Sequence, residues 1–247
     1  MSQPLGPAHV LVIPGIDGRT ELLESVAPVL FNGLVVHLFD HRHDSAEGGL
    51  DGLATRALAL LDAAGEGAEP AYVCGESFGG LIALTVAHRF PARVRGLILM
   101  STFGWCPTSS ARAIRLGLVA SHALGETLTG HLLTWSRPLS LLSNLGFPFE
   151  RRLAAAFLSP HRIDPRGYRR KGELSLRFDA RPWLDSIGCP AFVLSSTWDP
   201  IVPPHAGVEL AATLPNARLH RLSGAHLVHY TRAAEAGSLL GEWLAET

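Results

Sequence analysis

The sequence predicts an α/β fold: a mostly parallel sheet of six strands, flanked by helices, with a helical cap inserted into it. Short runs rich in Val, Ile and Leu alternate with longer amphipathic stretches, which is typical of buried parallel strands joined by helices. With 247 residues, 47% of them hydrophobic and 17% charged, the chain can form one sizeable core. The expected strands are His9–Ile13, Leu34–Phe39, Ala71–Gly75, Leu97–Ser101, Ala191–Ser196 and Arg218–Leu222.

Helices are expected between and after these strands, because parallel neighbours need a crossover connection. Amphipathic spacing and the positions of Pro and Gly set their limits to within roughly 2–4 residues. The expected helices are Thr20–Leu30, Leu50–Ala63, Gly80–His88, His205–Thr213 and Arg232–Ala245.

One connection, 103–190, is far longer than the dozen or so residues that a crossover requires. We therefore expect residues 1–102 and 191–247 to form the core, and residues 103–190 to form a helical cap that includes the crossover helix. Helical spacing predicts four cap helices, with Pro138, Pro148 and Pro160 as breaks. They are Ser110–Leu124, Thr127–Ser136, Leu139–Leu145 and Arg151–Leu158.

Composition narrows the class of protein. A formal net charge of −1 argues against a globally basic nucleic-acid binder, and the absence of any apolar run of eighteen residues argues against a membrane-spanning helix. No signal peptide is visible at the amino terminus. Three unclustered cysteines suit a reducing compartment and offer neither a disulfide framework nor a zinc site. We expect a cytoplasmic location and no nucleic-acid partner.

The clearest chemical signal is a Gly-x-Ser-x-Gly pattern, in which Ser77 lies between Gly75 and Gly79. Alone the pattern is weak, since chance produces it in a sizeable share of chains of this composition. Here an expected strand runs directly into Gly75 and an expected helix follows Gly79, the setting that places a serine hydroxyl on a sharp, exposed turn. Glycine suits both flanking positions because a tight turn leaves little room for a Cβ atom. The alternative is a glycine-rich turn that only connects two elements.

A serine nucleophile needs an imidazole base and a carboxylate that orients this base. Asp199 follows the fifth expected strand and His226 follows the sixth. In a parallel sheet, loops at the carboxyl ends of the strands lie at one edge, where open α/β folds bind their ligands. The sequence therefore predicts that Ser77, Asp199 and His226 lie close together.

Three motifs, in this order, resemble the α/β-hydrolase superfamily over essentially the whole chain. They are Gly75–Gly80 (GESFGG), Trp198–Pro203 (WDPIVP) and Gly224–His226 (GAH). The resemblance implies a serine-hydrolase triad of Ser77, Asp199 and His226, and leaves the substrate open. The chain departs from the family by starting at what resembles its third strand, so that the first two strands are missing.

The loop Val10–Gly18 resembles the family's loop after the first core strand, with Pro14 in place of the usual histidine. The resemblance implies that the backbone N–H groups of Ile16 and Phe78 bind the oxyanion of the reaction. A plain turn between strand and helix is the alternative for this loop.

Four further side chains are candidates for the surroundings of the site. Asp17, Trp135 and Trp198 could line the substrate pocket, although Trp198 could equally pack only against the sheet edge. Glu76 fills the variable position of the motif, where its side chain could contact a cap residue or nothing.

Other residues of the chain could act as the base or the nucleophile, or could bind a metal ion. His229 could replace His226 as the base or form a metal pair with it, although a pair without a third ligand is a poor zinc site. The segment 37–44 carries His and Asp residues but matches no metal motif, so a polar surface loop explains it. Cys74 lies within a strand and is expected in the core rather than as a nucleophile.

Together these features predict a serine hydrolase that cleaves carboxylic esters of small molecules through an acyl-enzyme, without metal or organic cofactor. Carbon–carbon bond hydrolysis and a ligand-binding receptor on the same fold are alternatives. A thioesterase is another, because the stretch 151–181 holds nine Arg and Lys residues against three acidic ones. Such a surface could dock an anionic substrate, coenzyme A or an acidic acyl carrier protein, or could simply be a solvated face.

Overall fold

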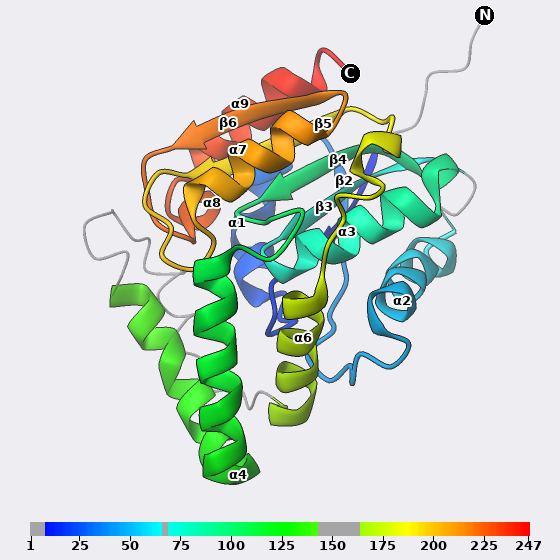
Figure 1. The fold of residues 1–247 in the computed structure, drawn as a ribbon. Coiled ribbons are helices and arrows are strands. Elements are labelled where there is room, and N and C mark those ends of the chain that lie inside the picture. The colour runs from blue at the N-terminus through cyan, green and yellow to red at the C-terminus, as the bar shows by residue number, and fades with distance from the viewer. Residues whose placement is uncertain (1–7, 66–68, 143–163) are drawn as a thin grey trace, which may run out of the picture.

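The computed structural model describes residues 8–65, 69–142 and 164–247, and the side chains within 8–65, 69–129 and 164–247. Six parallel strands form one sheet in the order β2-β1-β3-β4-β5-β6 (Figure 1), which confirms the predicted parallel sheet. The strands are β1 (His9–Ile13), β2 (Val35–Leu38), β3 (Ala71–Glu76), β4 (Val94–Met100), β5 (Ala191–Ser196) and β6 (Ala217–Leu222).

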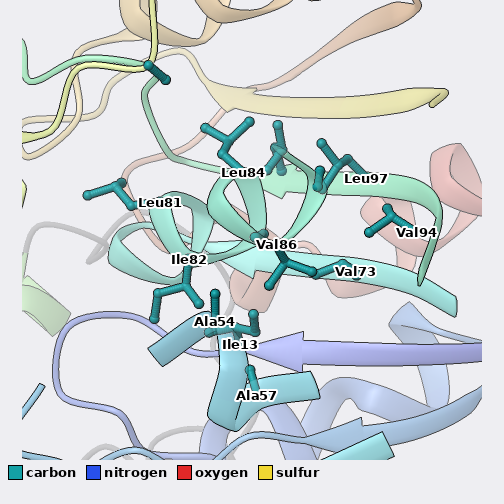
Figure 2. Packing of buried hydrophobic residues seen from close by; sticks show 14 of the residues in the cluster. Ile13, Ala54, Ala57, Val73, Leu81, Ile82, Leu84, Val86, Val94 and Leu97 are labelled. Atoms are coloured by element: carbon teal, nitrogen blue, oxygen red, sulfur yellow. The ribbon is translucent and has the colours of Figure 1, made fainter. Parts of the chain in front are cut away.

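Apolar side chains alternate along the central strands, so that each face of the sheet has its own core. In β1, Leu11 and Ile13 join the cluster under α2 (Gly49–Ala63), α3 (Phe78–Arg89) and α7 (Pro204–Thr213). Val10 and Val12 join the cluster under α1 (Glu21–Leu30), α8 (Val228–Thr231) and α9 (Ala233–Leu244). Figure 2 shows the first cluster, where side chains of the sheet meet those of α2 and α3. Burial on both faces explains why these strands form continuous apolar runs in the sequence.

The helices of the core lie close to their predicted ranges. One short helix, α8, was not predicted, because four residues are too few to show helical periodicity. The helices are α1 (Glu21–Leu30), α2 (Gly49–Ala63), α3 (Phe78–Arg89), α7 (Pro204–Thr213), α8 (Val228–Thr231) and α9 (Ala233–Leu244), with short 3₁₀ turns at Pro91–Arg93 and Leu184–Ser186.

The long connection between β4 and β5 leaves the core and returns to it at one place. Trp105 and Asp179 form an isolated antiparallel bridge, and the N–H of Ala180 donates to the carbonyl of Gly104 at 2.8 Å. Between these points the chain forms α4 (Thr108–Leu142) and α6 (Pro165–Arg177), which pack against each other (Figure 1).

Two expectations for this region need correction. Helix α4 is non-helical at Gly125, as expected between the first two predicted helices, but it continues through Pro138, where we expected a break. Helix α6 was missed, because the residues that it buries, Gly167, Lys171, Gly172 and Ser175, show no apolar periodicity. Its start carries clear signals nevertheless: Asp164 accepts hydrogen bonds from the N–H groups of Arg166 and Gly167, and Pro165 is the first helical residue. The predicted helix Arg151–Leu158 lies outside the described residues.

No helix in the described ranges is both long and apolar enough to cross a membrane.

A buried lysine ties α6 to the core. Lys171, 1% exposed, donates a hydrogen bond of 2.6 Å from Nζ to the carbonyl oxygen of His41. The His41 ring is buried as well, with Nε2 3.2 Å from the carbonyl oxygen of Pro14. Burial, together with the positive charge of Lys171, lowers the pKa of His41 to about 3, and burial lowers the pKa of Lys171 to about 8. His41 is therefore neutral in the folded protein at any ordinary pH.

The low pKa of His41 should make folding sensitive to acid. The unfolded chain takes up a proton on this residue near pH 6.5 and the folded chain does not, so stability is lost as the pH falls below that value. Between about pH 7 and about pH 5 this residue should cost about 2 kcal/mol of unfolding free energy. In His41→Gln, urea unfolding should show a pH dependence smaller by about this amount. Exposed His43, changed to Gln, is the control and should behave as wild type. An unchanged pH dependence in His41→Gln would contradict this account.

Candidate active site

Ser77 lies at the sharp turn between β3 and α3, in a backbone conformation that non-glycine residues rarely adopt. Its φ is 50° and its ψ is −120°. Its N–H donates to the carbonyl of Met100 at 2.9 Å, and its own carbonyl accepts a hydrogen bond from Thr102 Oγ1 at 2.7 Å. Bonds to the end of β4 thus hold the strained residue in place, as expected where strain serves a site.

The flanking glycines are required by close backbone contacts. A Cβ atom on Gly75 would lie 2.3 Å from the carbonyl oxygen of Gly79, and a Cβ atom on Gly79 would lie 2.1 Å from that of Ile13. Both distances are far below van der Waals contact with backbone atoms that cannot move aside. The prediction that this turn has no room for a Cβ atom is therefore confirmed.

Asp199 and His226 form a hydrogen-bonded pair. Nδ1 of His226 lies 2.7 Å from Oδ2 of Asp199, and both side chains are buried. The other carboxylate oxygen, Oδ1, accepts 2.8 Å hydrogen bonds from the backbone N–H groups of Ile201 and Val202. The carboxylate is thereby fixed, and a proton on Nδ1 leaves the Nε2 lone pair of His226 to act as a base.

The surroundings of His226 favour its protonated form. Burial by itself lowers the pKa of the imidazole, but the negative charge and hydrogen bond of Asp199, with a further contribution from the charge of Glu76, outweigh it. The pKa of His226 is consequently raised above its ordinary value. An imidazolium formed during a reaction would be stabilised here.

The two backbone groups predicted to bind an oxyanion lie on segments that border Ser77. Phe78 is the first residue of α3, and the first N–H groups of a helix have no partner within it. A Cβ atom on Gly15 would lie 3.7 Å from Cβ of Ser77, so the loop that carries Ile16 runs beside the serine. The turn in this loop is closed by a hydrogen bond from the N–H of Gly18 to the carbonyl of Gly15, not by the N–H of Ile16.

An apolar cavity of about 380 Å³ lies between α4 and α6 and reaches the same loop at Ile16. Its size falls within the range of small-molecule sites. Small or aliphatic residues line the α4 side, and polar groups enter from α6. The lining includes Ile114, Gly117, Leu118, Ser121 and Leu124 of α4 and Tyr168, Arg169 and Gly172 of α6.

None of the three residues predicted to line the substrate pocket is seen at this cavity in the described part of the chain. Neither Asp17 nor Trp198 is among the described residues that line the cavity. Trp198 is 78% exposed on the loop after β5, and Asp17 accepts a hydrogen bond from the N–H of Arg19 within its own turn. The side chain of Trp135 lies outside the described residues.

Glu76 and His229 form a second buried carboxylate–imidazole pair. Nε2 of His229 lies 2.6 Å from Oε2 of Glu76, which also accepts a 2.5 Å hydrogen bond from the hydroxyl of Tyr230. Oε1 of Glu76 accepts from the N–H of Gly15 at 2.9 Å. The expectation that Glu76 contacts the cap or nothing is wrong: it ends the central strand β3, and its partners belong to the core. His226, not His229, is the partner of Asp199.

The other titratable residues considered above are either buried in the core or paired in salt bridges. Cys74 is buried, which raises the pKa of its thiol well above the ordinary value and keeps it neutral. Asp40 pairs with Arg42, and Asp44 pairs with Arg56 at 2.7 Å. Among the residues whose positions are described, no group of three His, Cys, Asp or Glu side chains could hold a metal ion.

Comparison with known proteins agrees with this geometry. Residues 8–233 match the model of the alpha/beta hydrolase fold. The chain belongs to this family. It is 33% identical over 225 residues to a pimeloyl-[acyl-carrier protein] methyl ester esterase of Chromobacterium violaceum, covering 87% of this chain and 85% of that protein. It is 28% identical to a poly(3-hydroxyalkanoate) depolymerase of Ectopseudomonas oleovorans, covering 95% and 83%.

Solved structures show the same fold. The enol-lactonase of Burkholderia xenovorans superposes with a TM-score of 0.74 at 22% identity, covering 97% of this chain and 92% of that chain.

Loss of the carboxylate charge at Asp199 should nearly abolish activity, because His226 would lose the partner that sets its tautomer and stabilises its charge. For Asp199→Asn we expect kcat on an activated ester to fall by about 10⁴-fold with KM little changed. Wild-type kcat/KM should fall as the pH drops through the raised pKa of His226, so the midpoint of this limb should lie above 6.5.

Ser196→Ala provides the control for this substitution. It removes only the 3.3 Å hydrogen bond from Ser196 Oγ to Asp199 and should cost no more than a few-fold in kcat. If Asp199→Asn retained activity within tenfold of wild type, the reaction would not depend on the carboxylate charge of Asp199.

Proposed function

We propose that this protein is a serine hydrolase that cleaves carboxylic esters through an acyl-enzyme, with Ser77 as nucleophile, His226 as base and Asp199 as its partner. The observation that carries the proposal is the strained Ser77 at the same edge of the sheet as the buried Asp199–His226 pair. The membership of the alpha/beta hydrolase family and the methyl ester esterase among its relatives support it.

In the proposed reaction, Nε2 of His226 takes the proton of Ser77 Oγ while this oxygen attacks the carbonyl carbon of the ester. The N–H groups of Ile16 and Phe78 bind the oxyanion that forms. The bond to the alcohol then breaks, and the imidazolium gives its proton to the departing oxygen. Water attacks the acyl-enzyme with His226 again as base, which releases the acid and restores Ser77.

The cavity supports an apolar acyl group as the part of the substrate that this chain binds. It begins at Ile16, next to the proposed oxyanion site, and continues between small and aliphatic side chains of α4. A chain placed along it would exchange water for apolar contacts, worth about 0.8 kcal/mol for each buried methylene group. Longer acyl chains should therefore bind better until the cavity is full.

A second candidate function is hydrolysis of an acyl group borne on an acidic carrier or on coenzyme A. The observation that favours it is the cationic helix α6, which contributes Arg169 to the cavity and carries exposed Arg170 beside it. A relative named for an acyl-carrier-protein substrate points the same way. Acyl-coenzyme A and an oxygen ester of equal chain length distinguish thioester hydrolysis from ester hydrolysis. A much larger kcat/KM for acyl-coenzyme A would favour the thioesterase.

The relatives named 2-hydroxymuconate semialdehyde hydrolase keep carbon–carbon bond cleavage as a further alternative.

Reaction with a fluorophosphonate probe tests the proposed nucleophile. The probe should label wild-type protein at Ser77, detected by mass spectrometry of the peptide, and Ser77→Ala should be neither labelled nor active on p-nitrophenyl esters. Thermal unfolding of the variant should confirm that it is folded. If folded wild-type protein is not labelled by the probe, the serine-hydrolase proposal is wrong and a ligand-binding role is favoured.

Filling the cavity should shift the preferred chain length. Nothing lies within 4 Å of a Cβ atom placed on Gly117, which lines the cavity, so Gly117→Leu should fold and occupy part of it. Its kcat/KM should fall by at least tenfold for long-chain p-nitrophenyl esters and by less than threefold for the acetate. Val119→Leu, on the exposed face of the same helix, is the control and should keep the wild-type order. An equal loss for long and short esters would remove the cavity from the acyl site.

A further inference from the structure

Glu76 occupies an unusual position, because its single carboxylate joins three segments that carry different parts of the proposed machinery. It immediately precedes Ser77, and its Oε1 holds the N–H of Gly15, the residue before Ile16. Its Oε2 holds His229 and Tyr230 of α8, which follows the loop that carries His226. We propose that Glu76 is a positioning residue that aligns the Ile16 loop and the His226 loop with Ser77, and whose negative charge supports His226 as base. This inference rests on the proposed ester hydrolysis.

A backbone hydrogen bond ties the loop to Glu76. The N–H of Gly15 donates to Oε1 of Glu76 at 2.9 Å, so the position of the carboxylate sets the position of this backbone group. A Cβ atom on Gly15 would lie only 3.3 Å from Oε1 of Glu76. Since a displacement of about 1 Å in a catalytic group can cost about 10²-fold in rate, a loop held in this way matters for an oxyanion donor on the next residue.

The carboxylate is ionised although it is buried. Burial raises the pKa of Glu76, but its hydrogen bonds and charge interaction with His229, and its hydrogen bonds from Tyr230 and Gly15, outweigh burial and lower the pKa below the ordinary value. Burial and the neighbouring charge of Glu76 raise the pKa of Tyr230 well above its ordinary value, so this hydroxyl keeps its proton and acts as a donor. A fixed negative charge therefore lies next to the nucleophile.

That charge reaches His226. Asp199 and Glu76 are the charged groups that raise the pKa of His226 against the effect of burial. The titratable groups around Glu76 itself are His229, Tyr230 and Cys74. Removing the charge of Glu76 should therefore lower the pKa of His226 and move the acid limb of the pH profile to lower pH.

Two substitutions at position 76 separate the positioning effect from the charge. Glu76→Ala removes all three hydrogen bonds, and we expect kcat on p-nitrophenyl butyrate to fall by about 10²-fold, with KM within about threefold of wild type. Glu76→Gln removes the charge but keeps an oxygen that can accept from Gly15, so kcat should stay within about tenfold of wild type. We expect Glu76→Gln to stay active enough for a full pH profile. The acid limb of its kcat/KM should lie at lower pH than that of wild type, because the pKa of His226 falls when the charge of Glu76 is removed. Glu24→Gln, at an exposed carboxylate that binds Thr20, is the matched control and should change neither quantity.

The outcomes decide the inference. Wild-type kcat in Glu76→Ala would overturn it, and so would equal losses in both variants with an unshifted acid limb, which would leave Glu76 a purely structural role. Glu76→Ala exposes buried donors and could fail to fold; the position of the acid limb in Glu76→Gln then decides alone. Labelling of wild-type Ser77 by the fluorophosphonate is independent of Glu76. Its failure would remove the proposed function, whereas labelled protein with unaffected Glu76 variants would remove only this inference.

Discussion

The site depends on one steric constraint, the close approach of the start of α3 to β1 and to the turn before it. Gly79 lies so near the carbonyl of Ile13, and Gly75 so near that of Gly79, that no side chain fits at either position. At the centre of this tight turn, Ser77 takes a positive φ. Strain of this kind costs of the order of 1–3 kcal/mol and persists only where the surroundings enforce it. Here the hydrogen bonds to Met100 and from Thr102 do so.

The electrostatic arrangement around this turn consists of two carboxylate–imidazole pairs with different surroundings. In the first, Asp199 is fixed by two backbone N–H groups and holds Nδ1 of His226. In the second, Glu76 accepts hydrogen bonds from the Gly15 loop and from Tyr230 of α8, and it pairs with Nε2 of His229 in the same helix. The negative charge of Glu76 favours an imidazolium at His226 and disfavours negative charge on a reacting oxygen nearby, so the oxyanion relies on well-placed backbone donors.

Much of this could be predicted from local sequence. The strand–turn–helix pattern around Ser77 is contiguous, and Asp199 and His226 each follow an expected strand, so topology alone places them at one edge. The partners of Glu76 could not be predicted in this way, because Gly15 and His229 lie 61 and 153 residues away along the chain. Periodicity also failed for α6, whose start was signalled only by Asp164 and Pro165. The direction of the Trp198 side chain, which is 78% exposed, could not be predicted either, because adjacency to Asp199 in sequence does not fix it.

The positive charge of the region between β4 and β5 has a partly structural explanation. The chain's only lysine, Lys171, is buried against the carbonyl of His41 and so anchors α6 to the core. Arg166 and Arg169 share the carboxylate of Glu126, and Arg181 pairs with Asp179 at the base of the insertion. The exposed cations of α6 that remain are Arg170 and Arg177, and any attraction of α6 for an anionic substrate comes chiefly from them. Arg170 directly follows Arg169, which lines the cavity. Because an exposed cation is screened by salt within about 10 Å, such attraction would act on a group bound at the cavity mouth rather than steer a substrate from afar.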